Sequence, residues 1–343
     1  MTLMGSLISY LIVIHDSASA TPLANTFLGK ERWPMITAAA VFVLPLCFLD
    51  QKALSFTSTL AFVVNVYLIG LLFAEFSSKA GADELPDGAC WLGVGRGSVA
   101  MLAALAQCII IQMCVLPMYE QLEDRSPHRF AQALWIAFAI LAVVFALFAS
   151  LGYLSFGPDV QSNVLLNLPK RPATYIAQIA TIAVVAAVYP IMVIPMLAPL
   201  KKMDLRAVLG ARASVAASVR SWRRAIVSGA VFLIVGISYV GALAIDSLGF
   251  VNVVDGAVCV GAFTSLVPSF VGLRLMPRSS WSWKPLMFAL LAFGLTNAIL
   301  GICFSDNFQQ DVSRHCAWRA EGRTRSWSLR TAARPDVASD VVV

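Results

Sequence analysis

The chain has 343 residues, of which 59% are apolar and only 13% charged, whereas a soluble domain carries about 25% charged residues. This composition argues against a soluble enzyme. The formal net charge is +6, but the basic residues lie between apolar stretches, where orientation in a membrane explains them, so we expect no nucleic-acid partner. The seven cysteines form no CxxC motif and no cluster with histidine, which predicts neither a metal site nor a disulfide framework.

Nine apolar stretches follow one another along the chain, and Asp255 is the single charged residue within them. They cover residues 1–14, 33–49, 54–74, 97–118, 130–154, 172–199, 225–245, 247–273 and 285–304. Most have the length of about 20 apolar residues with which a helix crosses a bilayer, and continuous runs exclude a barrel, whose strands would alternate. We predict an all-α polytopic membrane protein of about nine spans over 1–304, with an Arg-rich, disordered tail at 305–343.

The ends and connections of these stretches predict their orientation. Residues 18–20 have the small-x-small form of a signal-peptidase site, but no basic residue precedes the stretch 1–14, so we favour a membrane span cut short at its beginning. The connection 200–224 carries seven basic residues and one acid, which places it in the cytoplasm. Alternation then places 155–171 outside, and we expect its apolar residues 164–166 to pack back on the membrane face.

Several spans contain prolines that interrupt a helix, namely Pro45, Pro117, Pro190 with Pro195, and Pro268. Each proline lacks a backbone donor and frees a carbonyl about one turn earlier. In hydrocarbon, such groups are tolerated where protein or a water-filled cavity satisfies them, as in the broken helices of transporters. A packing kink is the alternative for any single proline, but four such spans favour a transporter.

Asp255 lies near the start of the span 247–273. An apolar surrounding disfavours the charged form of a carboxylate, which is the condition for proton coupling, and acids inside a membrane are usually functional. The polar boundary near Asp246 is only about two turns away. The alternative is therefore a side chain that reaches water or caps a broken helix.

Two helical faces carry polar side chains in otherwise apolar spans. The first holds Cys108, Gln112, Val115 and Tyr119, with Gln107 on another face, and the second holds Gln178, Thr181, Val185 and Tyr189. These side chains either bind the polar groups of a substrate or hydrogen-bond a neighbouring helix. No nucleotide-binding fingerprint, Walker motif, HExxH or GxSxG occurs, so we expect no cofactor, no ATP-driven pumping and no enzymatic hydrolysis.

Longer motifs carry a family resemblance. They read VLPMYEQL at 115–122, GYLSFG at 152–157 and VQSNVLLNLP at 160–169, with further matches at 9–16, 189–195 and 267–269. Over about residues 5–304 the chain resembles the amino acid/auxin permease family of secondary transporters. That resemblance implies a LeuT-like fold of eleven spans, the first ten forming two inverted five-span repeats.

On the register of that family, this chain begins at the third span and is a truncated, N-terminally incomplete copy. The resemblance also implies an outside carboxyl terminus. Family members move amino acids with protons or sodium. Gln112 stands where many animal members have His, and Val188 stands where sodium-coupled members have Thr, so the resemblance favours protons over sodium.

We therefore predict proton-coupled secondary transport of amino acids in the plasma membrane or an endolysosomal or vacuolar membrane. Asp255 is the predicted proton-coupling residue. The predicted substrate-binding residues are Tyr10, Cys108, Gln112, Tyr119, Gln178 and Tyr189. The alternative is a sensor that binds an amino acid without moving it, or an inactive fragment of a transporter.

Overall fold

A computed structural model describes residues 2–26, 31–49, 56–82, 90–93, 96–108, 115, 118–120, 122–202, 216–275, 283–305 and 316–319. These residues are almost wholly helical. The main helices are α1 (Thr2–Ser19), α2 (Arg32–Leu46), α3 (Phe56–Gly81), α4 (Arg96–Cys108), α6 (Pro127–Phe156), α7 (Pro172–Lys202), α9 (Ala216–Ala244), α10 (Leu248–Cys259), α11 (Val267–Leu275) and α12 (Trp283–Cys303). A π-helix, η7 (Val260–Leu266), joins α10 to α11.

Shorter elements occupy the connections. Three 3-10 turns are η1 (Pro22–Asn25), η4 (Gly157–Asp159) and η5 (Val164–Leu166). Two short antiparallel strands, β1 (Cys90–Gly93) and β2 (Cys316–Arg319), pair with each other. β2 belongs to the predicted disordered tail, so this part of the tail is ordered against the connection between α3 and α4. The other residues of the tail beyond Ser305 lie outside the described part.

Six helical segments of the described chain are long and apolar enough, by length and composition, to cross a membrane. They are Thr59–Gly81, Pro127–Phe156, Pro172–Leu200, Arg223–Ala244, Leu248–Leu275 and Trp283–Cys303. α1 and α2 are shorter apolar helices. The prediction of an all-α polytopic membrane protein is confirmed, whereas only six of the nine predicted spans meet this criterion. Gln112 and Pro117, in the second half of the predicted span 97–118, lie outside the described residues.

The prolines differ in their effects on the helices. α7 continues through Pro190, Pro195 and Pro199, so the missing hydrogen bonds there do not end the helix. Pro268 instead follows the π-helix directly. Because Pro268 cannot donate to the carbonyl one turn earlier, the wider i→i+5 bonding of the π-helix fits the chain at this point.

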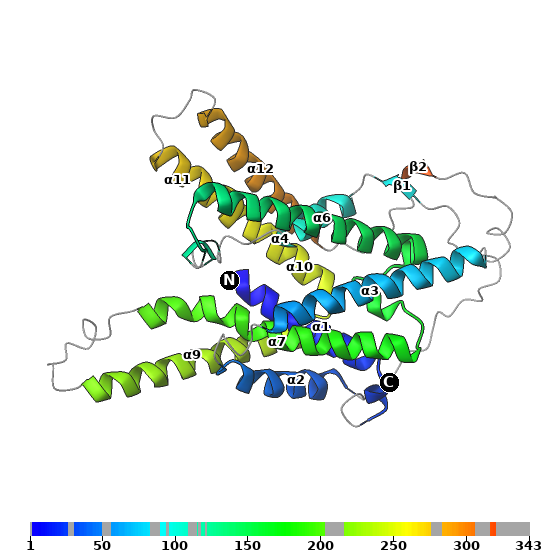
Figure 1. Ribbon diagram of the computed structural model, residues 1–343, viewed down its shortest axis with the longest axis horizontal. Helices are drawn as coiled ribbons and strands as arrows, with labels where there is room; N and C mark the ends of the chain where they lie inside the picture. The colour runs from blue at the N-terminus through cyan, green and yellow to red at the C-terminus, as the bar shows by residue number, and fades with distance from the viewer. Residues whose placement is uncertain are drawn as a thin grey trace, which may run out of the picture.

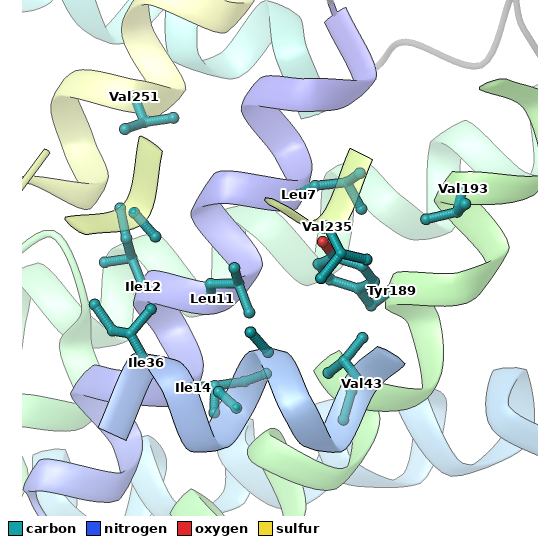
Figure 2. Close-up of a cluster of buried hydrophobic side chains, with 14 of the residues drawn as sticks. Leu7, Leu11, Ile12, Ile14, Ile36, Val43, Tyr189, Val193, Val235 and Val251 are labelled. Atoms are coloured by element: carbon teal, nitrogen blue, oxygen red, sulfur yellow. The ribbon is translucent and has the colours of Figure 1, made fainter. Parts of the chain in front are cut away.

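α1 lies in the middle of the helix bundle (Figure 1) and contacts α2, α7, α9 and α10. Its buried side chains include Leu7, Leu11 and Ile12, which are fully buried. Figure 2 shows these side chains packed with Val43 of α2 and Tyr189 of α7. This cluster is the main core of the protein, so α1 is the element against which the others are positioned.

A second group of helices packs without room for side chains. A Cβ atom at Gly256 of α10 would overlap the backbone carbonyl of Ala103 in α4. A Cβ at Gly301 of α12 would lie 2.8 Å from Ala257 Cβ and 2.9 Å from Ala103 Cβ. α4, α10 and α12 therefore meet backbone to backbone, while α11 and α12 extend together beyond the other helices at the upper left of Figure 1.

α3 extends beyond the predicted span 54–74 because two charged residues in its last turns have partners. Glu75 Oε1 lies 3.8 Å from Lys79 Nζ, and Glu75 Oε2 lies 3.7 Å from Arg171 Nη1. Lys79 also donates to the Ser155 carbonyl at 2.9 Å and lies over the Phe156 ring. The predicted connection 75–96 thus begins inside a helix.

The connection between α6 and α7 packs on the helices, as predicted. Leu165 is 5% exposed and lies in a hydrophobic cluster with Leu68 and Leu72 of α3. Asn163 accepts a hydrogen bond from the Leu165 amide and so starts the short η5 turn. The polar turn residue and the apolar residue that follows hold this connection against the protein.

Candidate functional site

Asp255 is the centre of the candidate site. It lies on α10 with only 7% of its surface exposed. Gln107 of α4 donates from Nε2 to Asp255 Oδ2 at 2.7 Å, and Ser6 of α1 donates to the same oxygen at 3.3 Å. Cys259, one turn later on α10, donates from Sγ to Oδ1 at 3.5 Å. The carboxylate therefore joins three helices that are distant in the sequence.

α1 presents a small polar face to α10. Ser9 donates to Asn252 Oδ1 at 2.9 Å, one turn from the contact between Ser6 and Asp255. Gly5 lies beside this contact, and a Cβ atom there would overlap the Asp255 carboxyl group. Glycine and serine at these positions thus allow the two helices to approach closely enough for the hydrogen bonds to form.

The surroundings of Asp255 put two physical effects in opposition. Burial among apolar side chains disfavours a charge, whereas hydrogen bonds donated to the carboxylate favour it. Among the described residues, no Lys or Arg forms an ion pair with this carboxylate. Hydrogen bonds, and not an ion pair among the described residues, therefore offset the cost of burying this carboxyl group.

On α4, the residue that contacts Asp255 is Gln107, the neighbour of the predicted substrate-binding residue Cys108. Cys108 is exposed and its Sγ bonds the Ala104 carbonyl of its own helix at 3.6 Å. Gln107, which the sequence placed on another face, reaches Asp255 instead. The useful signal was present in the sequence, because a glutamine and a carboxylate in separate apolar spans each need a polar partner in hydrocarbon.

The other predicted substrate-binding residues lie in different surroundings. Tyr10 is half-buried on α1, one turn after Ser6. Tyr189 is fully buried in the main core, where its hydroxyl lies 2.5 Å from Ser238 Oγ of α9. Tyr119 is half-buried and packs edge-on against the Phe130 ring of α6, with ring centroids 5.5 Å apart. Gln112 lies outside the described residues, so the structure places no contact on it.

Gln178 combines burial with an unused hydrogen-bonding atom. It is 2% exposed on α7, and its Oε1 has no hydrogen-bond partner among the described residues. An unpaired amide oxygen in the interior is unfavourable until a polar group reaches it. Of the predicted residues that the structure describes, Gln178 has the surroundings expected of a ligand contact.

Comparison with known proteins agrees with the arrangement of apolar helices. The model of the family "Transmembrane amino acid transporter protein" matches residues 1–305. The chain is 24% identical over 317 residues to amino acid transporter AVT6E of Arabidopsis thaliana, which covers 84% of this chain and 63% of the relative. It is 28% identical over 169 residues to vacuolar amino acid transporter 7 of Saccharomyces cerevisiae, covering 47% of this chain and 33% of the relative.

A mammalian relative also matches about half of the chain. Solute carrier family 38 member 10 of Mus musculus is 26% identical over 205 residues, which covers 56% of this chain and 18% of the relative. The chain spans less than two thirds of the length of these relatives. The family match nevertheless extends over nearly all of the described helices. The chain belongs to the transmembrane amino acid transporter protein family, whose members are multi-pass membrane transporters and not enzymes.

Proposed function

We propose that this protein moves amino acids across a membrane by secondary transport and that protons drive the movement. The family match and the names of the relatives support an amino acid as the substrate. Two relatives from Saccharomyces cerevisiae are named vacuolar transporters, which supports an endomembrane such as the vacuolar membrane, with the plasma membrane as the other candidate.

The observation that carries the proton proposal is the buried carboxylate of Asp255. It accepts hydrogen bonds from α1 and α4 as well as from its own helix. Protonation would remove an acceptor from this network, because a protonated oxygen donates a hydrogen bond. If the proton binds Oδ2, Gln107 turns its amide oxygen toward the proton or leaves the contact. Proton binding is thereby linked to the position of α4.

That link supports a mechanism of alternating access. Pro117 interrupts the helical hydrogen bonding of the predicted span 97–118, to which α4 belongs, so we propose a broken helix there in a LeuT-like, inverted-repeat arrangement. The amino acid would bind beside the break, contacted by Gln112 and Tyr119 after it, by Cys108 before it and by Tyr10 of α1. Gln178 would line the side formed by α7, whereas Tyr189 lies in the main core with its hydroxyl bonded to Ser238.

Sodium is the less favoured coupling ion. Val188 of α7 has no side-chain oxygen, and sodium binds through oxygen ligands. We therefore propose that Asp255 binds the proton that drives transport.

Transport by proteoliposomes containing the full chain tests the proposal. Wild type should accumulate a labelled amino acid under an inward pH gradient and exchange it at equal pH. Asp255→Asn should retain exchange and lose accumulation, because exchange needs the substrate site alone whereas uphill movement needs the proton. Asp124→Asn changes a carboxylate that is 83% exposed and should behave like wild type.

Two results would contradict the proposal. Accumulation by Asp255→Asn under a pH gradient would separate this residue from coupling, and a strict requirement for sodium would exclude proton drive. Binding of the labelled amino acid without exchange would favour the sensor. A screen of the twenty amino acids in the exchange assay identifies the substrate.

A further inference from the structure

The interface between η7, α11 and α12 contains buried polar atoms that the contacts above do not use. Asn297 of α12 is 4% exposed, and neither Oδ1 nor Nδ2 has a hydrogen-bond partner among the described residues. Ser269 of α11 is 1% exposed, and its Oγ likewise has no partner there. Thr264 of η7 adds a fourth buried atom without a partner, Oγ1.

Contacts between neighbouring residues place these side chains in one interface. A Cβ at Gly261 would lie 3.0 Å from Ala298 Cβ, and a Cβ at Gly272 would lie 2.7 Å from Met287 Sδ. Higher numbers on η7 and α11 thus meet lower numbers on α12, so the segments are antiparallel. Counted from the pair Gly261 and Ala298, Asn297 lies at the level of Thr264 within about one helical turn.

Asn297 also faces this interface and not the lipid. It lies between Gly294 and Gly301 on α12, and both glycines pack toward the neighbouring helices. Ser269 lies on the same side of α11 as Gly272, which contacts α12. Asn297 and Ser269 therefore face the seam between the two helical segments, and Thr264 of η7 lies at the level of Asn297.

The chemistry of these atoms identifies the occupant. Asn297 offers a free acceptor and a free donor, so the occupant must both donate and accept hydrogen bonds, which excludes a bare cation. The close contacts at Gly261 and Gly272 show that the segments pack tightly on both sides of these atoms, which favours a small occupant. Water meets these conditions, since a buried water needs two to four polar partners.

Along the chain, the seam between η7, α11 and α12 begins directly after the residues that contact Asp255. Cys259 bonds the carboxylate, and η7 starts at the next residue. From there α11 continues toward the 274–284 connection, on the side that the basic loop 200–224 predicts to be cytoplasmic. The described titratable and charged groups along this line are Tyr10 and Cys259 beside Asp255, and exposed Arg274 and Lys284 at the far end.

We propose that Thr264, Ser269 and Asn297 bind ordered water molecules at the π-helix and that these waters carry the proton between Asp255 and the cytoplasmic side. This inference rests on the proposed function. Protonated Asp255 breaks its O–H bond as a water oxygen accepts the proton, and each following water forms one O–H bond and breaks another. The proton leaves on the cytoplasmic side, and Asp255 remains as the carboxylate.

Thermal unfolding of the purified full chain tests for hydration without any transport. In a dry seam, replacing an unpaired polar group by an apolar group of similar size removes an unfavourable burial, so Asn297→Leu and Thr264→Val would raise the Tm. In a hydrated seam the same changes remove hydrogen bonds to water, and the Tm should stay or fall. Ser265→Ala is the matched control, because its hydroxyl already donates to the Gly261 carbonyl of the same helix at 2.9 Å.

Initial rates of uptake test the proton path. Under a pH gradient, Asn297→Leu and Thr264→Val should slow uptake by about tenfold, as expected from one lost hydrogen bond of about 1.4 kcal/mol. The final accumulation should match wild type, unlike that of Asp255→Asn, because a slower path does not change the driving force. Thr264→Ser keeps the hydroxyl and should restore the rate, and Thr264→Val carries the test alone if Asn297→Leu does not fold.

The outcomes separate the two proposals. A raised Tm in Asn297→Leu or Thr264→Val, or uptake at the wild-type rate in either folded variant, overturns the hydrated path. Wild-type uptake that ignores the pH gradient overturns the proposed function and the proton path with it. In that case the Tm comparison still decides whether water occupies the seam.

Discussion

Gln107 and Asp255 are 148 residues apart in the sequence, and 2.7 Å separates the amide nitrogen of the first from a carboxylate oxygen of the second. The hydrogen bond ties the last turn of α4 to the middle of α10. A hydrogen bond to a charged group in a medium of low polarity is stronger than one between neutral groups. This contact therefore contributes both to holding α4 in place and to the surroundings of the carboxylate.

A double-mutant cycle with Gln107→Leu and Asp255→Ala should give a coupling free energy of about 1.5–3 kcal/mol, the range for a hydrogen bond to a charged group. Reversible unfolding in detergent micelles measures each variant. Cys108→Ala replaces Gln107→Leu in the control cycle, because Cys108 bonds only its own helix among the contacts found. Equal coupling in both cycles would mean that the bond between Gln107 and Asp255 has no specific role.

Tyr189→Phe should lower the free energy of unfolding by about 1 kcal/mol and leave substrate affinity within about twofold of wild type. The hydroxyl is already bonded to Ser238, and the ring is fully buried in the main core. Equilibrium binding of labelled amino acid and unfolding in micelles measure the two effects. Unchanged stability with affinity reduced about tenfold would support the predicted contact between Tyr189 and substrate instead.

Glu75→Gln should destabilise the protein by about 2 kcal/mol, because it leaves Lys79 without its carboxylate partner in a half-buried position. Arg171→Gln should cost about 0–1 kcal/mol, since the Arg171 side chain is 62% exposed and water screens the pair. Unfolding of both variants at low and high salt gives the comparison. A larger loss for Arg171→Gln would show that Lys79 does not depend on Glu75.

Labelling of single cysteines tests the orientation that the basic loop predicts. Ser162→Cys replaces an exposed residue in the connection before α7, and Arg224→Cys replaces an exposed residue of α9 next to the basic loop. Both variants are made in a background without accessible native cysteines. A membrane-impermeant maleimide should label Ser162→Cys from outside sealed cells or right-side-out vesicles and should reach Arg224→Cys only after permeabilisation. The reverse pattern would invert the assignment of every loop.

The helices of this protein could be predicted from sequence because a bilayer selects apolar stretches of sufficient length. The limits of α3 could not, because Glu75 and Lys79 read as the start of a polar connection until their partners are known. The same limitation applies to prolines. Pro190 lies within a continuous helix and Pro268 beside a π-helix, and the difference depends on packing that the residue type does not report.

The buried carboxylate of the candidate site was identified from the sequence, whereas the residues on other helices that hydrogen-bond it were not. Asp255 stood out as the one charge inside an apolar stretch, and the structure buries it. Adjacent residues on a helix point about 100° apart, so Gln107 and Cys108 face different neighbours, and spacing alone does not identify Gln107 as the partner of Asp255. Ser6 and Asn297 are ordinary residues in sequence and become notable only through the helix that each one faces.

The contact between Gly256 and the Ala103 carbonyl limits which residues can replace Gly256 during the evolution of this protein. The carbonyl oxygen fills the space in which any side chain at position 256 would begin, so no single substitution there is neutral while α4 and α10 remain together. Gly301 faces two alanine methyl groups and is confined in the same way. While this packing is kept, only glycine fits at these two positions. Residues that face the lipid are not confined in this way.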